Sequence, residues 1–166
     1  PINDKKKPDL KNLIDATKLI SKCIKAGDII IYESTVYPGT TREICGKIIE
    51  KKTNLILYED DRRQSNLQNK KIFHLGYSPE RINPGDNDHN LKNLTKLISS
   101  SSAYGLKEIN SLYKKICDKL YICKSIEIAE AAKIIENTQR DLNIALFNEL
   151  SIIFNKLGLD SKQVFD

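Results

Sequence analysis

Residues 28–41 read DIIIYESTVYPGTT and pass from a strand through a turn into a helix. Their first half is apolar and rich in β-branched residues at consecutive positions, which is typical of a strand buried on both faces of a parallel sheet. The segment YPG at 37–39 ends this strand. Thr40 and Glu43 have the spacing of a capping box, so we expect a helix from there to about Lys51.

Apolar patterns on both sides of this segment continue the alternation of helix and strand. Asp9 can cap a helix with apolar residues at helical spacing up to Ile24, and Gly27 suits a left-handed C-terminal cap. Strands are predicted at 55–58, 72–77, 97–99 and 120–123, a helix at 106–116, an exposed polar loop at 59–71 and a structured loop at 80–88. The alternation predicts an α/β fold with a doubly wound sheet.

A long helix is predicted for the last part of the chain, because no Pro or Gly interrupts the run from Ile126 to Leu157. Such a helix is about 48 Å long at 1.5 Å per residue, too long for one layer of a compact sheet domain. Its apolar residues cover more than one stripe and imply burial on several sides. We therefore expect it to pass between domains or to pack against a second subunit. Gly158 ends the run.

Composition limits the classes of protein that remain. The chain has 166 residues and a net charge of +5, which suits one domain or one domain with part of another. It has no apolar run long enough to span a membrane. The lysine doublets have no interleaved aromatics, so we expect no nucleic-acid interface; such an interface would show steep salt dependence. None of the four cysteines has zinc-site spacing, so we expect no metal site and a reducing cytoplasm.

Two loops follow predicted strands at the sheet edge where α/β proteins bind ligands. Ser34 and Thr35 precede the free N–H groups of a helix start, which can hold an anion or an ordered water. An ordinary strand–turn–helix joint would have the same sequence. In the second loop, Glu80 follows Pro79 and is a candidate general base. The alternative is a solvated carboxylate paired with Arg81.

The long helix carries a third candidate feature. Lys133 and Asn137 are four residues apart and so point to the same side of the helix. An ammonium and a carboxamide placed together can stabilise an oxygen that becomes negative during a reaction. The residues 136–141 around them are polar on every side. A Lys and an Asn at this spacing also occur on ordinary helix surfaces.

Three segments in this order resemble the UDP-glucose/GDP-mannose dehydrogenase family, the nucleotide-sugar 6-dehydrogenases. They are STVYPGTT at 34–41, GYSPERINPGD at 76–86 and AEAAKIIENTQRDLNIA at 129–145, followed by NEL at 148–150. The segment ERINPG at 80–85 most resembles family members that act on UDP-N-acetylhexosamines. The resemblance implies a two-step, NAD-dependent oxidation of a UDP-sugar at C6 to the uronate, for surface polysaccharide precursors.

The resemblance also implies roles for individual residues. Thr35 would position a water and the nicotinamide, with Ser34 beside it in the cofactor site. Glu80 would act as base in the hydrolysis of a thioester intermediate. Lys133 and Asn137 would stabilise the oxyanion at C6. The substrate-binding set would comprise Glu80, Arg81, Ile82, Asn83, Pro84, Lys133 and Asn137.

Parts of the family pattern are missing. The sequence contains neither the Gly-rich NAD fingerprint nor the Gly-Gly-His-Cys stretch with the catalytic cysteine, it opens with Pro1, and it has no Met. We therefore expect a piece of a longer protein that is inactive by itself. By resemblance, residues 1–124 form the second half of an NAD-binding domain. Residues 125–166 form the central long helix and the start of a dimerisation domain, with the homodimer built on that helix. The segment 59–71 would be a surface insertion.

Two other readings stay open. β-Hydroxyacid and 6-phosphogluconate-type dehydrogenases also place a Lys and an Asn four apart on a helix. They require glycines ahead of the Lys, where this chain has alanines, and they lack the Ser-Pro-Glu-Arg loop. A non-catalytic dimerisation module on the same scaffold is the second alternative, because the catalytic cysteine lies outside this sequence.

Overall fold

The computed structural model describes residues 2–60, 71–80 and 94–166. It contains a mixed sheet of five strands, in the order β1-β3-β4-β5 with β2 also paired to β3. The strands are β1 (Ile29–Tyr32), β2 (Ile56–Leu57), β3 (Ile72–Tyr77), β4 (Thr95–Ser100) and β5 (Lys119–Ile122). The predicted strands are therefore confirmed, with boundaries moved by one or two residues.

The sheet is parallel except where β3 meets β4. There the pairing is antiparallel, with Gly76 opposite Ser100 and Tyr77 opposite Ser99. In this register the first half of β4 extends past the carboxyl end of β3. It therefore lies beside the residues that lead into the Glu80 loop.

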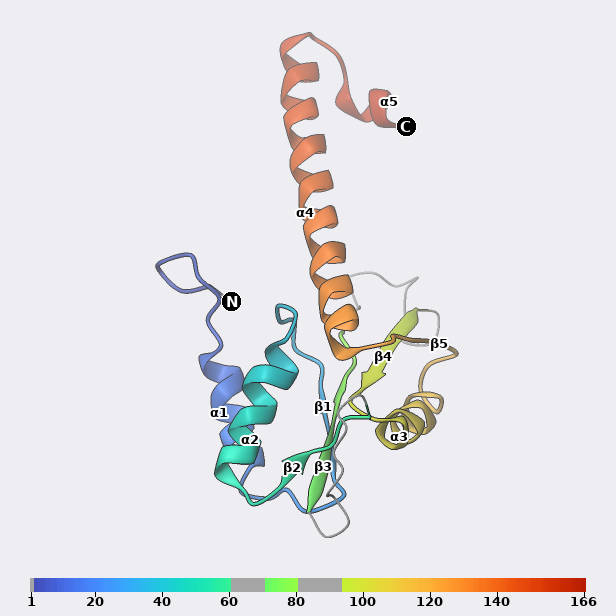
Figure 1. Ribbon diagram of the computed structural model, residues 1–166. Coiled ribbons are helices and arrows are strands. Elements are labelled where there is room, and N and C mark those ends of the chain that lie inside the picture. Colours follow the sequence, from blue (N-terminus) through green and yellow to red (C-terminus); the bar gives the residue numbers. More distant parts are fainter. Residues whose placement is uncertain (1, 61–70, 81–93) are drawn as a thin grey trace.

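Helices cover both faces of the sheet, as a doubly wound fold requires. They are α1 (Lys11–Ile20), the π-helix η1 (Thr40–Gly46), α2 (Lys47–Lys52), α3 (Ala103–Tyr113), α4 (Ile126–Lys156) and α5 (Ser161–Phe165). Figure 1 shows α1 and α2 together on one side of the sheet and α3 on the other, while α4 rises away from the sheet domain. None of the helices in the described part of the chain is long and apolar enough to cross a membrane.

Strand β1 is covered on both faces, as its sequence predicts. Ile30 and Tyr32 are buried in the larger apolar cluster, which includes residues of η1, α2, β3 and α4. Ile29 and Ile31 point the other way and pack against the cluster of Ile98, Ile109 and Tyr113. Gly76 in β3 allows α3 to approach closely, because a Cβ there would lie 2.3 Å from Ile109 Cδ1.

The long helix is confirmed as α4, which has 31 residues. Ser125 caps its start by accepting the backbone N–H of Ile128 at 3.3 Å. Gly158 follows its end with φ 72°. At the other end of the chain, α1 stops at Ile20 and is shorter than its apolar spacing predicts. Gly27 does have φ 89°, but it lies beyond a turn and donates to Ile72 O rather than ending the helix directly.

Two local predictions are wrong. Thr40 and Glu43 form no capping box: the Thr40 hydroxyl donates to Tyr37 O, and Gly39 occupies the N-cap position with φ 91°. Glu59 was expected in an exposed loop and is instead fully buried. At Thr40 the local turn decides the outcome, because the N–H groups of Thr40 and Glu43 bond to Tyr37 O and Gly39 O. Glu59 is buried beside Arg42, 17 residues earlier in the chain. The rest of the predicted loop lies largely outside the described residues.

Candidate functional site

The Ser34–Thr35 loop lies at the carboxyl end of β1. Both residues are exposed there, while the following Val36 is buried. The Tyr77 hydroxyl donates to Ser34 O at 3.1 Å, which ties the loop to the end of the neighbouring strand β3. The two hydroxyl side chains predicted to take part in a site are therefore held at the ligand-binding edge of the sheet.

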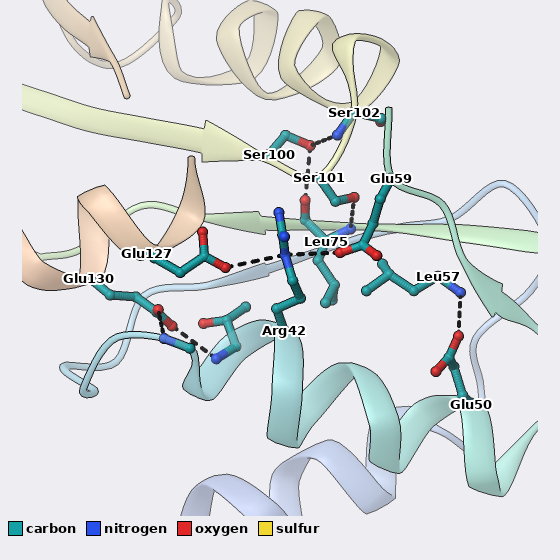
Figure 2. A network of polar contacts seen from close by, with 12 residues as sticks. Arg42, Glu50, Leu57, Glu59, Leu75, Ser100, Ser101, Ser102, Glu127 and Glu130 are labelled. Atoms are coloured by element: carbon teal, nitrogen blue, oxygen red, sulfur yellow. Dashed lines mark hydrogen bonds and ion pairs between the residues drawn. The ribbon is translucent and has the colours of Figure 1, made fainter. Parts of the chain in front are cut away.

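The helix start behind this loop holds an anion that the chain itself supplies. Gly39 N–H donates to Glu130 Oε2 at 2.6 Å, and Thr41 N–H donates to Glu130 Oε1 at 2.9 Å. Figure 2 shows the Glu130 carboxylate reaching from α4 to these two groups. The sequence analysis predicted an anion or water at this place but gave no role to Glu130.

Burial raises the pKa of the Glu130 carboxyl, whose side chain is completely shielded from solvent. The hydrogen bonds from Thr41 and Gly39 act in the opposite direction and only partly offset this effect. A carboxyl group in this environment needs both backbone donors. Because Glu130 accepts both N–H groups, neither of them is open to a negatively charged ligand.

Lys133 lies one turn further along α4 on the same side as Glu130. Its side chain is only 9% exposed, and Nζ lies 3.8 Å from Glu136 Oε2. Glu136 also lies 3.5 Å from the guanidinium of Arg140. Asn137 is half-buried. The predicted donor pair thus sits at the junction of the sheet domain and the protruding part of α4, and part of its polar surroundings is paired within the helix.

Glu80 is exposed just beyond the carboxyl end of β3. Arg81, Ile82, Asn83 and Pro84, predicted to contact substrate, lie outside the described residues. The convergence of Glu80 with Lys133 and Asn137 stays a prediction.

Lys96 holds the chain segment that precedes Glu80. The sequence analysis did not single out this residue. The buried Lys96 ammonium donates to Ser78 O and to Pro79 O, each at 3.3 Å. It also lies 3.1 Å from the Glu33 carboxylate at the end of β1. One cation therefore links the carboxyl ends of β1 and β3, directly ahead of the proposed base.

Glu33 also accepts a hydrogen bond from the Tyr113 hydroxyl at 2.5 Å. Burial alone would raise the pKa of Glu33, but the Tyr113 hydrogen bond and the Lys96 ammonium lower it overall. The carboxylate is thus kept ionised as the partner of Lys96. This network is a structural support for the sheet edge.

A second ionic cluster fixes the start of α4. Arg42 Nε in η1 lies 2.9 Å from Glu59 Oε1 and 3.2 Å from Glu127 Oε1 (Figure 2). Glu59 follows β2, so the cluster joins three elements. Nothing in the local sequence marks these residues, because each partner comes from a different part of the chain.

An open cavity of about 410 Å³ adjoins the Thr35 loop. Thr35, Val36, Tyr37 and Ile134 line one part of it, and residues of the N-terminal segment line the rest. Ile134 is the neighbour of Lys133 in sequence. The cavity therefore adjoins both the β1 loop and α4. Its walls are mostly apolar, and Asp9 and Thr35 are among its lining residues.

Comparison with known proteins matches nearly the whole chain. Residues 1–117 match the model of the UDP-glucose/GDP-mannose dehydrogenase family, NAD binding domain, and residues 127–166 match the central domain of the same family. The chain is 48% identical over 165 residues to a UDP-N-acetyl-D-glucosamine 6-dehydrogenase of Pseudomonas aeruginosa. It is 47% identical over 165 residues to the enzyme of that name from Salmonella typhi. In both cases 99% of this chain is covered, and it spans 36% of the relative's length.

Solved structures agree with the fold. A UDP-D-ManNAc dehydrogenase from Pyrococcus horikoshii superposes with a TM-score of 0.81 at 27% identity, covering 99% of this chain and 36% of that one. A UDP-glucose dehydrogenase from Pyrobaculum islandicum has a TM-score of 0.80 at 19% identity, with 99% and 35% covered. At that identity the second similarity concerns the fold alone.

Proposed function

Since the chain belongs to the UDP-glucose/GDP-mannose dehydrogenase family, we propose that the complete protein oxidises C6 of a UDP-N-acetylhexosamine to the uronate with NAD. The observation that carries this proposal is the joint match of both family domains. The substrate class is supported by the names of the relatives at 48% and 47% identity. The product would be a precursor of surface polysaccharide.

The cavity beside Thr35 suits one end of the cofactor. Its mostly apolar walls fit a flat ring such as nicotinamide, and Asp9 and Thr35 are among its lining residues. Ser34 and Thr35 would hold that ring and an ordered water. Bound NAD would accept the hydride that leaves C6 in each of the two oxidation steps.

Lys133 and Asn137 would act on the oxygen at C6. As this oxygen gains negative charge, an ammonium and a carboxamide on one side of a rigid helix stabilise it. The low exposure of Lys133, at 9% of its side chain, strengthens the interaction because water competes less. Glu80, with Arg81, Ile82, Asn83 and Pro84 beside it in the substrate loop, would remove a proton from the water that hydrolyses the thioester.

We assign residues 1–124 to the second half of the NAD-binding domain and 125–166 to the central helix and the start of a dimerisation domain. The ends of the two family matches, at 117 and 127, support this division. We place the complete protein in the cytoplasm, a compartment in which its four cysteines would stay reduced.

We assign the homodimer interface to the protruding part of α4. Its large apolar side chains are exposed within this chain, among them Leu142, Ile144, Leu146, Phe147, Ile152 and Ile153. A patch of this kind marks a protein interface. Leu146→Asp should shift the complete protein from dimer to monomer in light scattering, whereas Lys114→Asp, on the exposed end of α3, should not. An unchanged mass for Leu146→Asp would contradict the assignment.

The reaction is tested with the complete protein, NAD and a panel of UDP-sugars, by counting NADH formed per sugar consumed. Two NADH per UDP-N-acetylhexosamine supports the proposal. One NADH points to a β-hydroxyacid-type dehydrogenase, and none with any sugar points to a non-catalytic dimerisation module. A Gly-Gly-His-Cys stretch in the reading frame beyond Asp166 provides an independent check.

A further inference from the structure

We propose that Glu130 is a positioning residue. Its carboxylate fixes the position of the Thr35 loop relative to α4, the helix that carries Lys133 and Asn137. This inference rests on the proposed function, because it concerns the alignment of those groups. Glu130 itself touches neither cofactor nor substrate in this account. It acts through the backbone of the loop.

The geometry of the contact is bidentate. One carboxylate oxygen accepts Gly39 N–H at 2.6 Å and the other accepts Thr41 N–H at 2.9 Å. Two hydrogen bonds from residues two apart fix both the distance and the orientation of the loop relative to α4. A single contact would leave a rotation free.

The contact lies between the groups that have to be aligned. Thr35 is four residues before Gly39, and Lys133 is three residues after Glu130 on the same side of α4. The path from one functional side chain to the other therefore runs through a short loop, two hydrogen bonds and one helical turn. A shift of about 1 Å in such a path can reduce a catalytic rate about 10²-fold.

Attachment of α4 to the sheet domain does not depend on Glu130 alone. Ile126 and Ala129 are fully buried in the larger apolar cluster. Glu127 adds an ion pair to Arg42 at 3.2 Å. These contacts hold the helix, whereas Glu130 binds the backbone of the loop.

The desolvation of Glu130 is also costly. Its side chain has no exposure to solvent, and an apolar residue of similar size would pack there without desolvating a charge. We infer that the carboxylate is buried here because it fixes the positions of the Gly39 and Thr41 N–H groups.

The test uses the complete protein with Glu130→Gln and, as a matched control, Glu127→Gln. Both changes remove one charge from the first turns of α4, and both residues contact the segment from Gly39 to Arg42. Glutamine keeps the size of Glu130 but can accept only one of the two N–H groups, because its amide nitrogen is a donor. We expect Glu130→Gln to lower kcat about 10²-fold with KM for the UDP-sugar nearly unchanged, and Glu127→Gln to keep most of kcat.

Amide hydrogen exchange provides a readout that does not require activity. The Gly39 and Thr41 amides should exchange slowly in the wild type and in Glu127→Gln, and faster in Glu130→Gln. Glu130→Asp should resemble Glu130→Gln, because its carboxylate is one methylene too short. If Glu130→Gln does not fold, Glu130→Asp takes its place, and failure of both to fold would make Glu130 a requirement for folding and overturn the proposal.

Equal losses of kcat in Glu130→Gln and Glu127→Gln, or wild-type kcat in Glu130→Gln, would also overturn it. The proposed function fails separately, if the wild-type protein forms no NADH with any UDP-sugar. An active wild type, an inactive Lys133→Ala and a fully active Glu130→Gln would leave the function standing and remove the role of Glu130.

Discussion

The two ends of α4 differ in which side chains they bury and which they expose. In its first turns the buried residues include Glu130 and Lys133, both of them charged. Beyond Asp141 most of the large apolar residues are exposed within this chain, with Leu142 at 64% and Leu157 at 66%. This reverses the usual rule that charged side chains face water and apolar ones do not.

The contrast separates two tasks of one helix. At the first end, charged groups are buried because the chain supplies their partners, from the loop after β1 and from α4 itself. At the far end, large apolar groups are exposed within this chain, where we propose the dimer interface. The helix would therefore join the proposed site to the proposed dimer interface.

The largest effect is expected from removing the buried ammonium. Lys133→Ala should lower kcat of the complete protein about 10²-fold or more, if Lys133 stabilises the oxyanion. Lys114→Ala, at the exposed end of α3, should leave kcat unchanged. Steady-state assays with NAD and the UDP-sugar check this, and equal activities would remove Lys133 from the mechanism.

Truncation of apolar side chains should distinguish the two ends by stability. Ile126 has no exposure, so Ile126→Ala should lower the free energy of unfolding by about 2–5 kcal/mol. Ile144 is 56% exposed, so Ile144→Ala should change it by less than about 0.5 kcal/mol in dilute monomer. Urea titrations of both variants provide the measurement. Similar losses would mean that the far end is also covered within one chain.

Two glycines with positive φ, one near each end of α4, allow a smaller comparison of stability. Gly39 has φ 91° and Gly158 has φ 72°, so alanine should cost about 1–2 kcal/mol at either place. Gly39→Ala should cost more, because its Cβ would lie 3.4 Å from Glu43 Cδ and any shift would disturb the bond to Glu130. A Gly158→Ala variant has nothing within 4 Å of the new Cβ. Thermal melts that show the reverse order would contradict this account.

The smallest expected effect is a pH dependence. Burial raises the pKa of Glu130 above its ordinary value of 4.5, so the carboxyl binds a proton more readily in the folded chain than in the unfolded one. The linked contribution to stability is complete below 4.5 and is lost as pH rises through the raised value. The stability difference between wild type and Glu130→Gln should thus move in favour of wild type as pH falls from 8 to 5. Denaturant titrations across this range check the sign.

Local prediction succeeded where the signal lies within one element. The strands, α3 and α4 follow from apolar periodicity and from Gly and Pro positions, because those patterns act over a few residues. The loops with Ser34, Thr35 and Glu80 were found because they follow strand ends. Prediction failed for the capping box at Thr40, because Gly39 occupies the N-cap position and the N–H groups of Thr40 and Glu43 bond to Tyr37 O and Gly39 O.

The amino-acid sequence by itself determined the alternation of strands and helices, the length of α4 and the candidate residues on it. Only the tertiary structure decided which charges meet: Glu130 with Gly39 and Thr41, Arg42 with Glu59 and Glu127, and Lys96 with Glu33. The physical reason is the separation in sequence over which each effect acts. Backbone preference and periodicity act between neighbours, whereas a buried charge is stable only next to a partner that folding brings from elsewhere.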